Sequence, residues 1–351
     1  MASSIRRTVF FEAPGRVNVR EETLPVPSAD EVRVQTTLSG ISPGTERLIY
    51  RGNAPKDLPA DASFPSMDGT SLSFPLSYGY ACVGVVDDVG SEVDSDWIGA
   101  RVFAFQPHTS AFTCGPDDLL VLPEAVSDEE AVLLPSLETA VNFVLDGRPV
   151  IGESVVVFGQ GVVGLLTTAL LSEHPVGNLV SVEPAAERRR WSRELGACST
   201  FSSDDLDAVQ EALGVTSQDA VEASQAFEGA DLSYEVSGNP DVLNDAIACT
   251  GFSGRIVVGS WYGTHATSLA LGRRFHRSRM DIRSSQVSTI DPRDRGRWSK
   301  DRRMNLVLSL LEMHSFRALV THSYSIDNAA RAYEELDGGD PAMLQPILCY
   351  Q

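Results

Sequence analysis

The stretch Val155–Gly164 reads Val-Val-Val-Phe-Gly-Gln-Gly-Val-Val-Gly, an apolar β-branched run leading directly into glycines spaced G-x-G-x-x-G. The run predicts a buried parallel strand. The glycines then allow a tight turn, close approach of a pyrophosphate and close strand–helix packing. Backbone N–H groups at the start of the next helix would face the phosphates. We therefore predict a dinucleotide site, with a glycine turn that serves packing only as the alternative; its residues are Gly159, Gln160, Gly161, Val162, Val163 and Gly164.

An acidic residue follows this loop at the spacing that dinucleotide binding requires. Glu183 ends the strand-like segment Leu179–Val182 and stands 24 positions after Gly159. A carboxylate about 20 residues after the glycine motif accepts hydrogen bonds from the adenine ribose. Glu183 favours NAD as the cofactor, because a carboxylate would repel the 2′-phosphate of NADP.

The periodicity predicts two kinds of domain. From Val155 onward strand-like and helical segments alternate, which predicts a doubly wound parallel sheet in an α/β fold. Before residue 126, short segments such as Thr8–Arg20 and Glu31–Leu38 alternate apolar and polar residues between Gly and Pro turns, which indicates a β-rich domain. Ser127 and Glu130 form a capping-box pattern that opens a helix, which we expect Pro135 to interrupt.

Composition excludes several classes of function. The 351 residues suffice for two domains, and 48 acidic against 28 basic residues give a net charge of −20. Such a surface repels nucleic acid and anionic membranes. No apolar run is long enough for a membrane span, and the N-terminus has no signal-peptide core, so we expect a cytoplasmic protein. Five scattered cysteines without a C-x-x-C pair predict neither a disulfide framework nor a Cys-rich zinc site.

The charge is unusual in kind and in distribution. Lys56 and Lys300 are the only lysines. An acid-rich, lysine-poor surface is typical of halophilic proteins, in which salt screens self-repulsion; an acidic mesophile protein from a GC-rich genome is the alternative. Between Arg273 and Arg303 the net charge is +7, against −27 for the remainder of the chain.

Several motifs together resemble the medium-chain dehydrogenase/reductase superfamily. They are Val9-Phe-Phe-Glu-Ala-Pro-Gly, Gly79–Val86, Glu183-Pro-Ala-Ala-Glu-Arg188, Tyr234-Glu-Val-Ser-Gly-Asn-Pro and Gly254-Arg-Ile-Val-Val-Gly-Ser-Trp-Tyr-Gly. The resemblance implies a GroES-like catalytic domain (1–126), a Rossmann domain (127–286), a C-terminal return completing the catalytic domain (287–351), and a homodimer. Within the superfamily, Ser39-Gly-Ile-Ser-Pro-Gly-Thr-Glu-Arg and Ser284-Ser-Gln-Val look like the branch that contains bacteriochlorophyllide dehydrogenases.

The sequence departs from the superfamily pattern at the positions of the zinc ligands. Zinc alcohol dehydrogenases place Cys, His-Glu and a further Cys or carboxylate where this chain has Ser42, Tyr80-Ala81 and Pro135. Catalytic zinc needs three protein ligands, and none of these residues is a good one. The structural four-Cys lobe is missing as well. We therefore predict an enzyme without zinc.

Without the metal, other groups must handle the substrate proton. The resemblance places Thr45 at a proton-relay position and Tyr80 at that of the zinc histidine, where a phenol could polarise a carbonyl oxygen or serve packing alone. Glu46 could hold the fold or touch substrate. His108 is a weaker general-acid candidate.

The resemblance also implies cofactor and substrate contacts. Expected cofactor contacts, besides the glycine loop and Glu183, are Thr139, Arg188, Ser237, Gly259 and Ser260. Arg188 and Arg189 leave NADP as an alternative cofactor. Expected substrate contacts are His108, Trp261, Arg273 and Arg277, of which the two arginines would suit an anionic substrate. Arginines that pair with an acidic surface or subunit are the alternative.

The sequence thus predicts an oxidoreductase that transfers a hydride between NAD(H) and a small alcohol or carbonyl substrate without zinc. Two alternatives stay open. One is an NADPH-dependent enone or quinone reductase, and the other is a non-catalytic protein that senses the dinucleotide.

Overall fold

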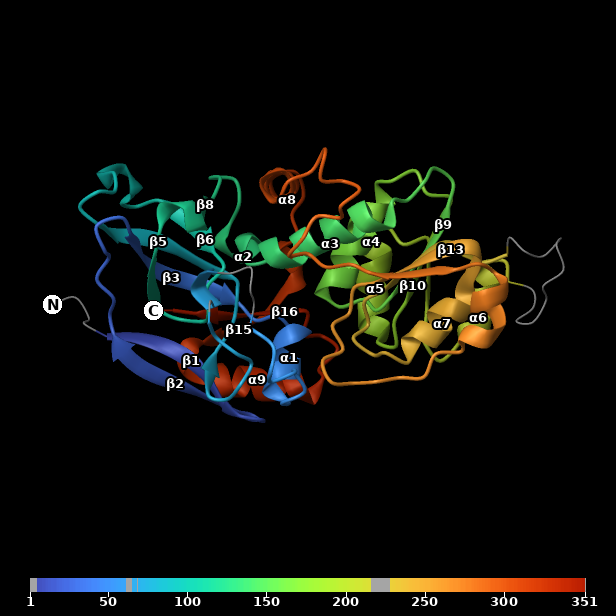
Figure 1. The fold of residues 1–351 in the computed structure, drawn as a ribbon, viewed down its shortest axis with the longest axis horizontal. Helices are drawn as coiled ribbons and strands as arrows, with labels where there is room; N and C mark the ends of the chain where they lie inside the picture. Colours follow the sequence, from blue (N-terminus) through green and yellow to red (C-terminus); the bar gives the residue numbers. More distant parts are fainter. Residues whose placement is uncertain (1–4, 61–64, 68, 216–227, 351) are drawn as a thin grey trace. The chain divides into compact units, whose positions relative to one another are not determined.

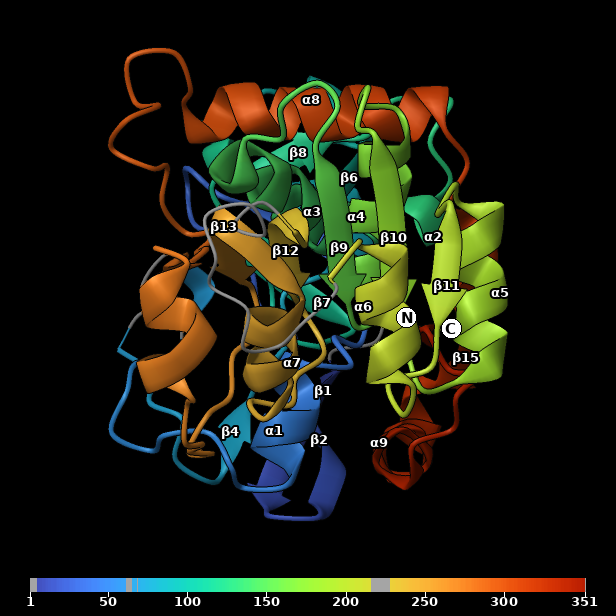
Figure 2. The same cartoon turned by 90° about the vertical axis from the view of Figure 1, so that its right-hand side faces the viewer.

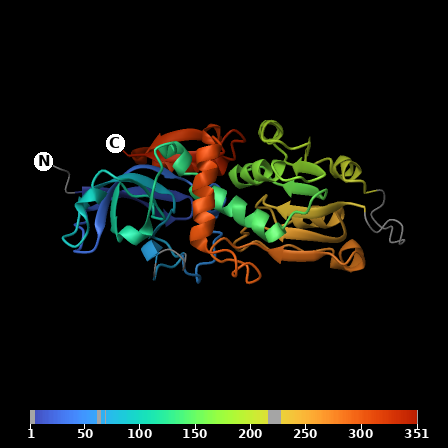
Figure 3. The ribbon, with the colours of Figure 1, turned by 90° about the horizontal axis from the view of Figure 1, so that it is seen from above.

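The computed structural model describes residues 5–60, 65–67, 69–215 and 228–350. The chain divides into two compact units, one of Met1–Pro135 with Leu308–Gln351 and the other of Ser136–Val307. Compared with the expected domains, 127–135 belong to the first unit and 287–307 to the second. The boundary at 307 lies inside α8 (Lys300–Met313), which Figure 3 shows as one continuous helix.

The second unit contains the predicted parallel sheet. Its strands are β9 (Ser154–Phe158), β10 (Asn178–Val182), β11 (Ser199–Phe201), β12 (Ala230–Glu235), β13 (Thr250–Val258) and β14 (Asp281–Ser284). Neighbours pair in parallel in the order β11-β10-β9-β12-β13-β14, and Figure 2 shows β11 to β13 in this sequence. This is the order of the doubly wound dinucleotide-binding fold, which confirms the predicted fold class.

Helices pack against this sheet and explain the apolar run in β9. They are α3 (Leu134–Gly147), α4 (Val162–Ser172), α5 (Ala186–Glu194), α6 (Leu206–Ala212) and α7 (Val242–Cys249). Successive side chains of a strand point to opposite faces. Val155 and Val157 belong to one buried cluster and Val156 and Phe158 to another. Because both faces are covered, all four positions need apolar side chains.

The first unit is rich in β-structure, as predicted. Its strands are β1 (Ile5–Ala13), β2 (Arg16–Thr23), β3 (Val32–Gly40), β4 (Leu76–Ser77), β5 (Cys82–Val89), β6 (Arg101–Ala104), β7 (Ala111–Cys114), β8 (Leu119–Val121), β15 (Val320–Ser325) and β16 (Gln345–Cys349); its helices are α1 (Thr45–Tyr50), α2 (Asp128–Ala131) and α9 (Ala329–Gly338). One sheet has the order β15-β16-β3-β5-β6-β8, with β7 also paired to β3, and a smaller one the order β2-β1-β4 (Figure 1).

The C-terminal segment completes this first unit. β16 pairs antiparallel with β3, and Leu348 lies opposite Ser39. α9 contributes Ala332, Tyr333 and Leu336 to the core that also contains Val9 and Ile49. The return of the chain thus brings Tyr333 and the end of β16 to the part of the unit that contains α1. Among the described helices, none is long and apolar enough to cross a membrane.

Candidate active site

The three glycines after β9 have different structural roles. Gly159 has φ +95°, and a Cβ there would lie 2.6 Å from the Ser237 backbone. A Cβ on Gly164 would lie 2.0 Å from the carbonyl oxygen of Gly159. Both positions therefore need glycine for packing. Gly161 differs, because a Cβ there would meet no protein atom within 4 Å.

The open side of Gly161 adjoins the N-terminus of α4. Gly161 is the N-cap of this helix, and no side chain caps it. The first N–H groups of a helix lack partners within the helix, and they favour an anion. Val162 is buried and Val163 half-buried, so their side chains pack inward. The backbone at Gly161 is therefore open to a pyrophosphate. Gly159 and Gly164, in contrast, are needed for packing, as the alternative interpretation of the loop expects.

Glu183 lies at the end of β10 and is joined to the glycine loop. Its Oε2 accepts a hydrogen bond from the backbone N–H of Gln160 at 2.8 Å, and its Oε1 accepts one from Ala185 at 3.1 Å. The side chain is buried, with 5% exposure. Gln160 is anchored in turn by Thr168, whose hydroxyl donates to Oε1 of Gln160 at 3.0 Å. The carboxylate is thus held by main-chain donors beside the loop.

Arginines follow Glu183 on α5. Arg188 and Arg189 are half-buried and Arg190 is exposed. Arg189 donates to the carbonyl oxygens of Glu183 and Pro184, both at 2.6 Å. Arg189 therefore closes the turn after β10, and Arg188 stays a predicted cofactor contact.

A second buried carboxylate lies at the carboxyl end of the sheet. Glu235 ends β12, is fully buried, and accepts hydrogen bonds from the Ser237 backbone and hydroxyl and from the Tyr262 hydroxyl. Ser260 Oγ accepts from the Gly238 N–H at 2.9 Å. Burial, and then the Glu235 charge, raise the pKa of Tyr262, so its phenol remains a donor. These contacts join the loops after β12 and β13.

The remaining predicted cofactor positions lie on the same unit. A Cβ on Gly259 would lie 2.1 Å from the Phe143 ring, so this glycine permits close packing of β13 against α3. Thr139 is half-buried on α3. In parallel sheets of this kind, ligands bind at the carboxyl ends of the strands, where Gly159, Ser237 and Ser260 lie.

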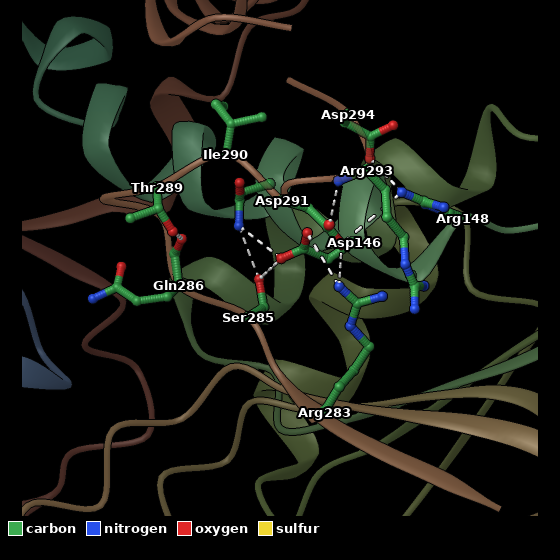
Figure 4. A network of polar contacts seen from close by, with 12 residues as sticks. Asp146, Arg148, Arg283, Ser285, Gln286, Thr289, Ile290, Asp291, Arg293 and Asp294 are labelled. Carbon is green, nitrogen blue, oxygen red and sulfur yellow. Dashed lines mark hydrogen bonds and ion pairs between the residues drawn. The ribbon is translucent and has the colours of Figure 1, made fainter. Parts of the chain in front are cut away.

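The basic segment Arg273–Arg303 makes many of its contacts within the second unit. Arg283 pairs with Asp291, and Asp294 accepts a hydrogen bond from Arg148 at 2.7 Å (Figure 4). Asp294 also accepts a hydrogen bond from Arg297 at 2.9 Å. Ser285 donates to Asp146 at 2.6 Å. These contacts attach residues 285–297 to α3 and to the turn that follows it.

Arg303 also pairs with a carboxylate of the second unit, and its side chain is buried. It has 1% exposure and contacts Glu138 at 2.7 Å, Asn142 and the carbonyl oxygen of Val287. Arg273 and Arg277 have exposed side chains, and Trp261 is 38% exposed. Much of the basic segment is therefore structural, and these three residues stay predicted substrate contacts.

Three hydroxyl groups gather in the first unit, and we call Ser42, Thr45 and Tyr80 the hydroxyl cluster. The Tyr80 phenol donates to Ser42 Oγ at 2.5 Å and lies 3.4 Å from Thr45 Oγ1. All three side chains are half-buried. The structure thus brings together Thr45, the predicted relay residue, and Tyr80, the residue expected at the position of the zinc histidine.

Glu46 and His108 lie beneath this cluster. Both are fully buried, and His108 Nε2 lies 2.9 Å from Oε2 of Glu46. Glu46 also accepts hydrogen bonds from the Ser42 N–H at 2.8 Å and from the Tyr333 hydroxyl. Their side chains are satisfied by protein groups. A direct contact of either with substrate stays a prediction.

The donor set around the expected metal position does not fit zinc. Ser42 and Tyr80 are hydrogen-bonded to each other, and proline has no ligating side chain. Within the described ranges, no group of three or more His, Cys, Asp or Glu side chains could hold a metal ion. Burial raises the pKa of the nearby Cys82 thiol to about 12, so it remains protonated.

Some site residues were not predicted from the sequence. Glu235 has the same signal as Glu183, an acid at the carboxyl end of a buried strand, and could have been found by it. Tyr333 could not, because it reaches Glu46 from a helix 287 residues later in the chain.

The chain is similar in sequence to known dehydrogenases. Residues 162–302 match the family model described as zinc-binding dehydrogenase. The chain is 28% identical to sorbitol dehydrogenase 1 of Saccharomyces cerevisiae, over 95% of each protein. It is 25% identical to (R,R)-butanediol dehydrogenase of Bacillus subtilis, over 86% of this chain and 93% of that protein.

A solved structure shares the fold. It is described as a short chain alcohol dehydrogenase (rspB) from E. coli CFT073 complexed with NADH, and it superposes with a TM-score of 0.77 at 20% identity. The match covers 99% of this chain and 100% of that one. The two chains therefore share one fold over nearly their whole lengths.

Proposed function

We propose that this chain is a zinc-independent medium-chain dehydrogenase/reductase that transfers a hydride between NAD(H) and an alcohol or carbonyl substrate. The observation that carries the proposal is the glycine loop, in which Gly161 leaves an open backbone cradle at the start of α4 beside Glu183. Both relatives described above are named as dehydrogenases of hydroxylated substrates. Small diols and polyols and their ketones are accordingly the substrate class to test first.

The cofactor and the protein have separate tasks. When bound, NADH supplies the hydride for a carbonyl carbon, and NAD⁺ accepts it in the reverse direction. Backbone groups from Gly161 onward would bind the pyrophosphate, and Glu183 would bind the adenine ribose. The Glu183 carboxylate supports a preference for NAD over NADP. Arg188 would lie near the adenosine, as the superfamily resemblance implies.

Proton transfer is the task of the hydroxyl cluster. In the reductive direction the Tyr80 O–H turns from Ser42 Oγ to the substrate oxygen, donates a hydrogen bond to it and then transfers its proton. A solvent proton, relayed by Ser42 or Thr45 at 2.5 and 3.4 Å from the phenol oxygen, replaces the one transferred. The phenol thus takes over part of the polarising role that a metal has in zinc enzymes.

Titration and turnover together test the proposal. NADH binding is followed by fluorescence, and NAD⁺-dependent oxidation is measured over a panel of diols and polyols. We expect Tyr80→Phe to lower kcat by about 100-fold or more, the usual contribution of a proton donor, with NADH affinity retained. Tyr324→Phe is the matched control, because it removes a hydrogen-bonded phenol hydroxyl, the donor to Glu335, elsewhere in the same unit.

Other outcomes would favour the alternatives. Turnover only with NADPH and an activated double bond would indicate an enone or quinone reductase. Tight NADH binding without hydride exchange on any substrate would indicate a sensor. If the substrate is anionic, Arg273→Ala and Arg277→Ala should lower kcat/KM for charged substrates more than for neutral ones, and equal losses would contradict that role.

A further inference from the structure

A buried network lies under the hydroxyl cluster and joins distant parts of the first unit. Its members are Ser39, Glu46, His108, Tyr333 and Tyr350. Ser39, Glu46, His108 and Tyr333 have 0% exposure. His108 Nδ1 lies 2.7 Å from Ser39 Oγ, which lies 2.8 Å from the Tyr350 hydroxyl. Tyr350, the fifth member, is half-buried. Buried polar groups require hydrogen-bond partners, and here each side chain of the network has them.

Glu46 is the centre of the network. Its carboxylate has three hydrogen-bond partners: the Ser42 N–H at 2.8 Å, His108 Nε2 at 2.9 Å and the Tyr333 hydroxyl. An ionised carboxylate only accepts hydrogen bonds, so this arrangement fits the ionised form with His108 donating from Nε2. Burial, and then the Glu46 charge, hold the pKa of Tyr333 well above its usual value, so this phenol also donates.

The network contacts both chain segments that carry the hydroxyl cluster. Glu46 holds the backbone N–H of Ser42, the residue that accepts the hydrogen bond of Tyr80. His108 packs against Gly79, the residue before Tyr80: a Cβ at Gly79 would lie 2.7 Å from the imidazole ring. Gly79 has φ +129°, which favours glycine at this close approach.

We propose that Glu46 and His108 are positioning residues, which fix the distance between Ser42 and Tyr80 and do not contact substrate. The inference rests on the proposed function, because the Tyr80 phenol is taken as the proton donor. Complete burial, with protein hydrogen-bond partners on both Glu46 oxygens, distinguishes this role from direct catalysis. A displacement of about 1 Å at a reacting group can reduce the rate by about 100-fold.

Conservative variants test this role with a readout that does not need turnover. Tyr333→Phe removes one donor to Glu46 and keeps the ring, and Tyr324→Phe is its control. His108→Gln retains a donor near the Nε2 position, whereas His108→Leu removes both ring nitrogens at similar volume. In protein labelled with ¹³Cζ-tyrosine, Tyr80→Phe assigns the Tyr80 resonance, which reports the hydrogen bonding of its phenol.

We expect Tyr333→Phe and His108→Leu to shift the Tyr80 resonance and to lower kcat by about tenfold or more. KM and NADH affinity should change less than about twofold, a small difference in binding free energy. His108→Gln should restore part of kcat, and Tyr324→Phe should change neither signal nor rate. If His108→Leu does not fold, Tyr333→Phe and His108→Gln decide the question.

An unchanged Tyr80 resonance and unchanged kcat in the folded variants would overturn the positioning role. A loss confined to KM would overturn it as well, because it would indicate contact with substrate. Absence of hydride transfer in the unmodified protein would contradict the proposed function. The Tyr80 resonance would still decide whether Glu46 and His108 hold the cluster.

Discussion

The backbone N–H of Gln160 donates a hydrogen bond to Oε2 of Glu183 across 2.8 Å. The bond joins the glycine loop after β9 to the end of β10. Glu183 also accepts from the Ala185 N–H at 3.1 Å, so its carboxylate fixes two turns at the carboxyl edge of the sheet. One side chain therefore holds the loop geometry and also carries the charge to which we assign the proposed preference for NAD over NADP.

Glu183→Gln separates these two contributions. We expect it to weaken NADH binding and to raise the affinity for NADPH relative to NADH, because the charge that repels a 2′-phosphate is removed. Fluorescence titration with both cofactors measures the ratio. Glu187→Gln, an exposed acid on α5, is the control. An equal loss for both cofactors would show that Glu183 acts only through the loop.

Alanine substitutions at Gly161 and Gly164 distinguish a role of the glycine loop in cofactor binding from a role in packing. Gly161→Ala introduces a methyl group into open space at φ −71°, a conformation that alanine adopts freely. The fold should stay intact, while NADH affinity falls by about tenfold, or about 1.4 kcal/mol. Gly164→Ala should instead destabilise the protein, because its Cβ would meet the Gly159 carbonyl at 2.0 Å. Normal NADH binding by a folded Gly161→Ala variant would favour the packing interpretation.

The Tyr234 hydroxyl predicts a stabilising substitution. Tyr234 is fully buried on β12, and its hydroxyl is one of two buried side-chain polar atoms in the described part of the chain that lack a hydrogen-bond partner. An unsatisfied buried polar group costs about 1–3 kcal/mol. Tyr234→Phe should therefore raise the free energy of unfolding by about 1 kcal/mol, measured by denaturant titration. A loss of stability would indicate that the hydroxyl binds an internal water molecule.

Acid should weaken the attachment of residues 285–297. The Arg293 backbone N–H, and then the Arg283 side chain, hydrogen-bond Asp291 and hold its pKa below the usual value. A lowered folded-state pKa gives stability that is present above the unfolded value of about 3.9 and is lost as pH falls through the folded value. The difference in Tm between the unmodified protein and Asp291→Asn should shrink over that range. A difference that does not depend on pH would contradict this linkage.

Local chemistry explains which elements could be predicted from sequence. Ser127 and Glu130 form the predicted capping box at α2. The helical run breaks at Val132 and Leu133, and Pro135, which was expected to interrupt it, lies instead in the first turn of α3, where a missing N–H costs little. Thr8–Arg20, expected as one strand, is a hairpin, because the chain turns at Gly15 with φ +70°. Each feature depends on residues close in sequence.

The candidate site shows where such prediction ends. The spacing of Gly159 and Glu183 was enough to place both at one edge of the sheet, because parallel strands align their carboxyl ends. The contacts of Glu46 were not predictable, since His108 and Tyr333 come from segments 62 and 287 residues away. The pairing of Arg303 with Glu138 likewise joins segments 165 residues apart and depends on tertiary packing, whereas Arg297 pairs with Asp294 only three residues away.

Zinc independence is tested most directly by measuring metal content and NAD⁺-dependent diol oxidation on the same protein sample. Inductively coupled plasma mass spectrometry gives the zinc content before and after treatment with a chelator. With Ser42, Tyr80 and Pro135 at the expected metal position, we predict substoichiometric zinc and an oxidation rate that the chelator does not change. Stoichiometric zinc, with activity that falls on its removal and returns on its addition, would contradict the proposed mechanism.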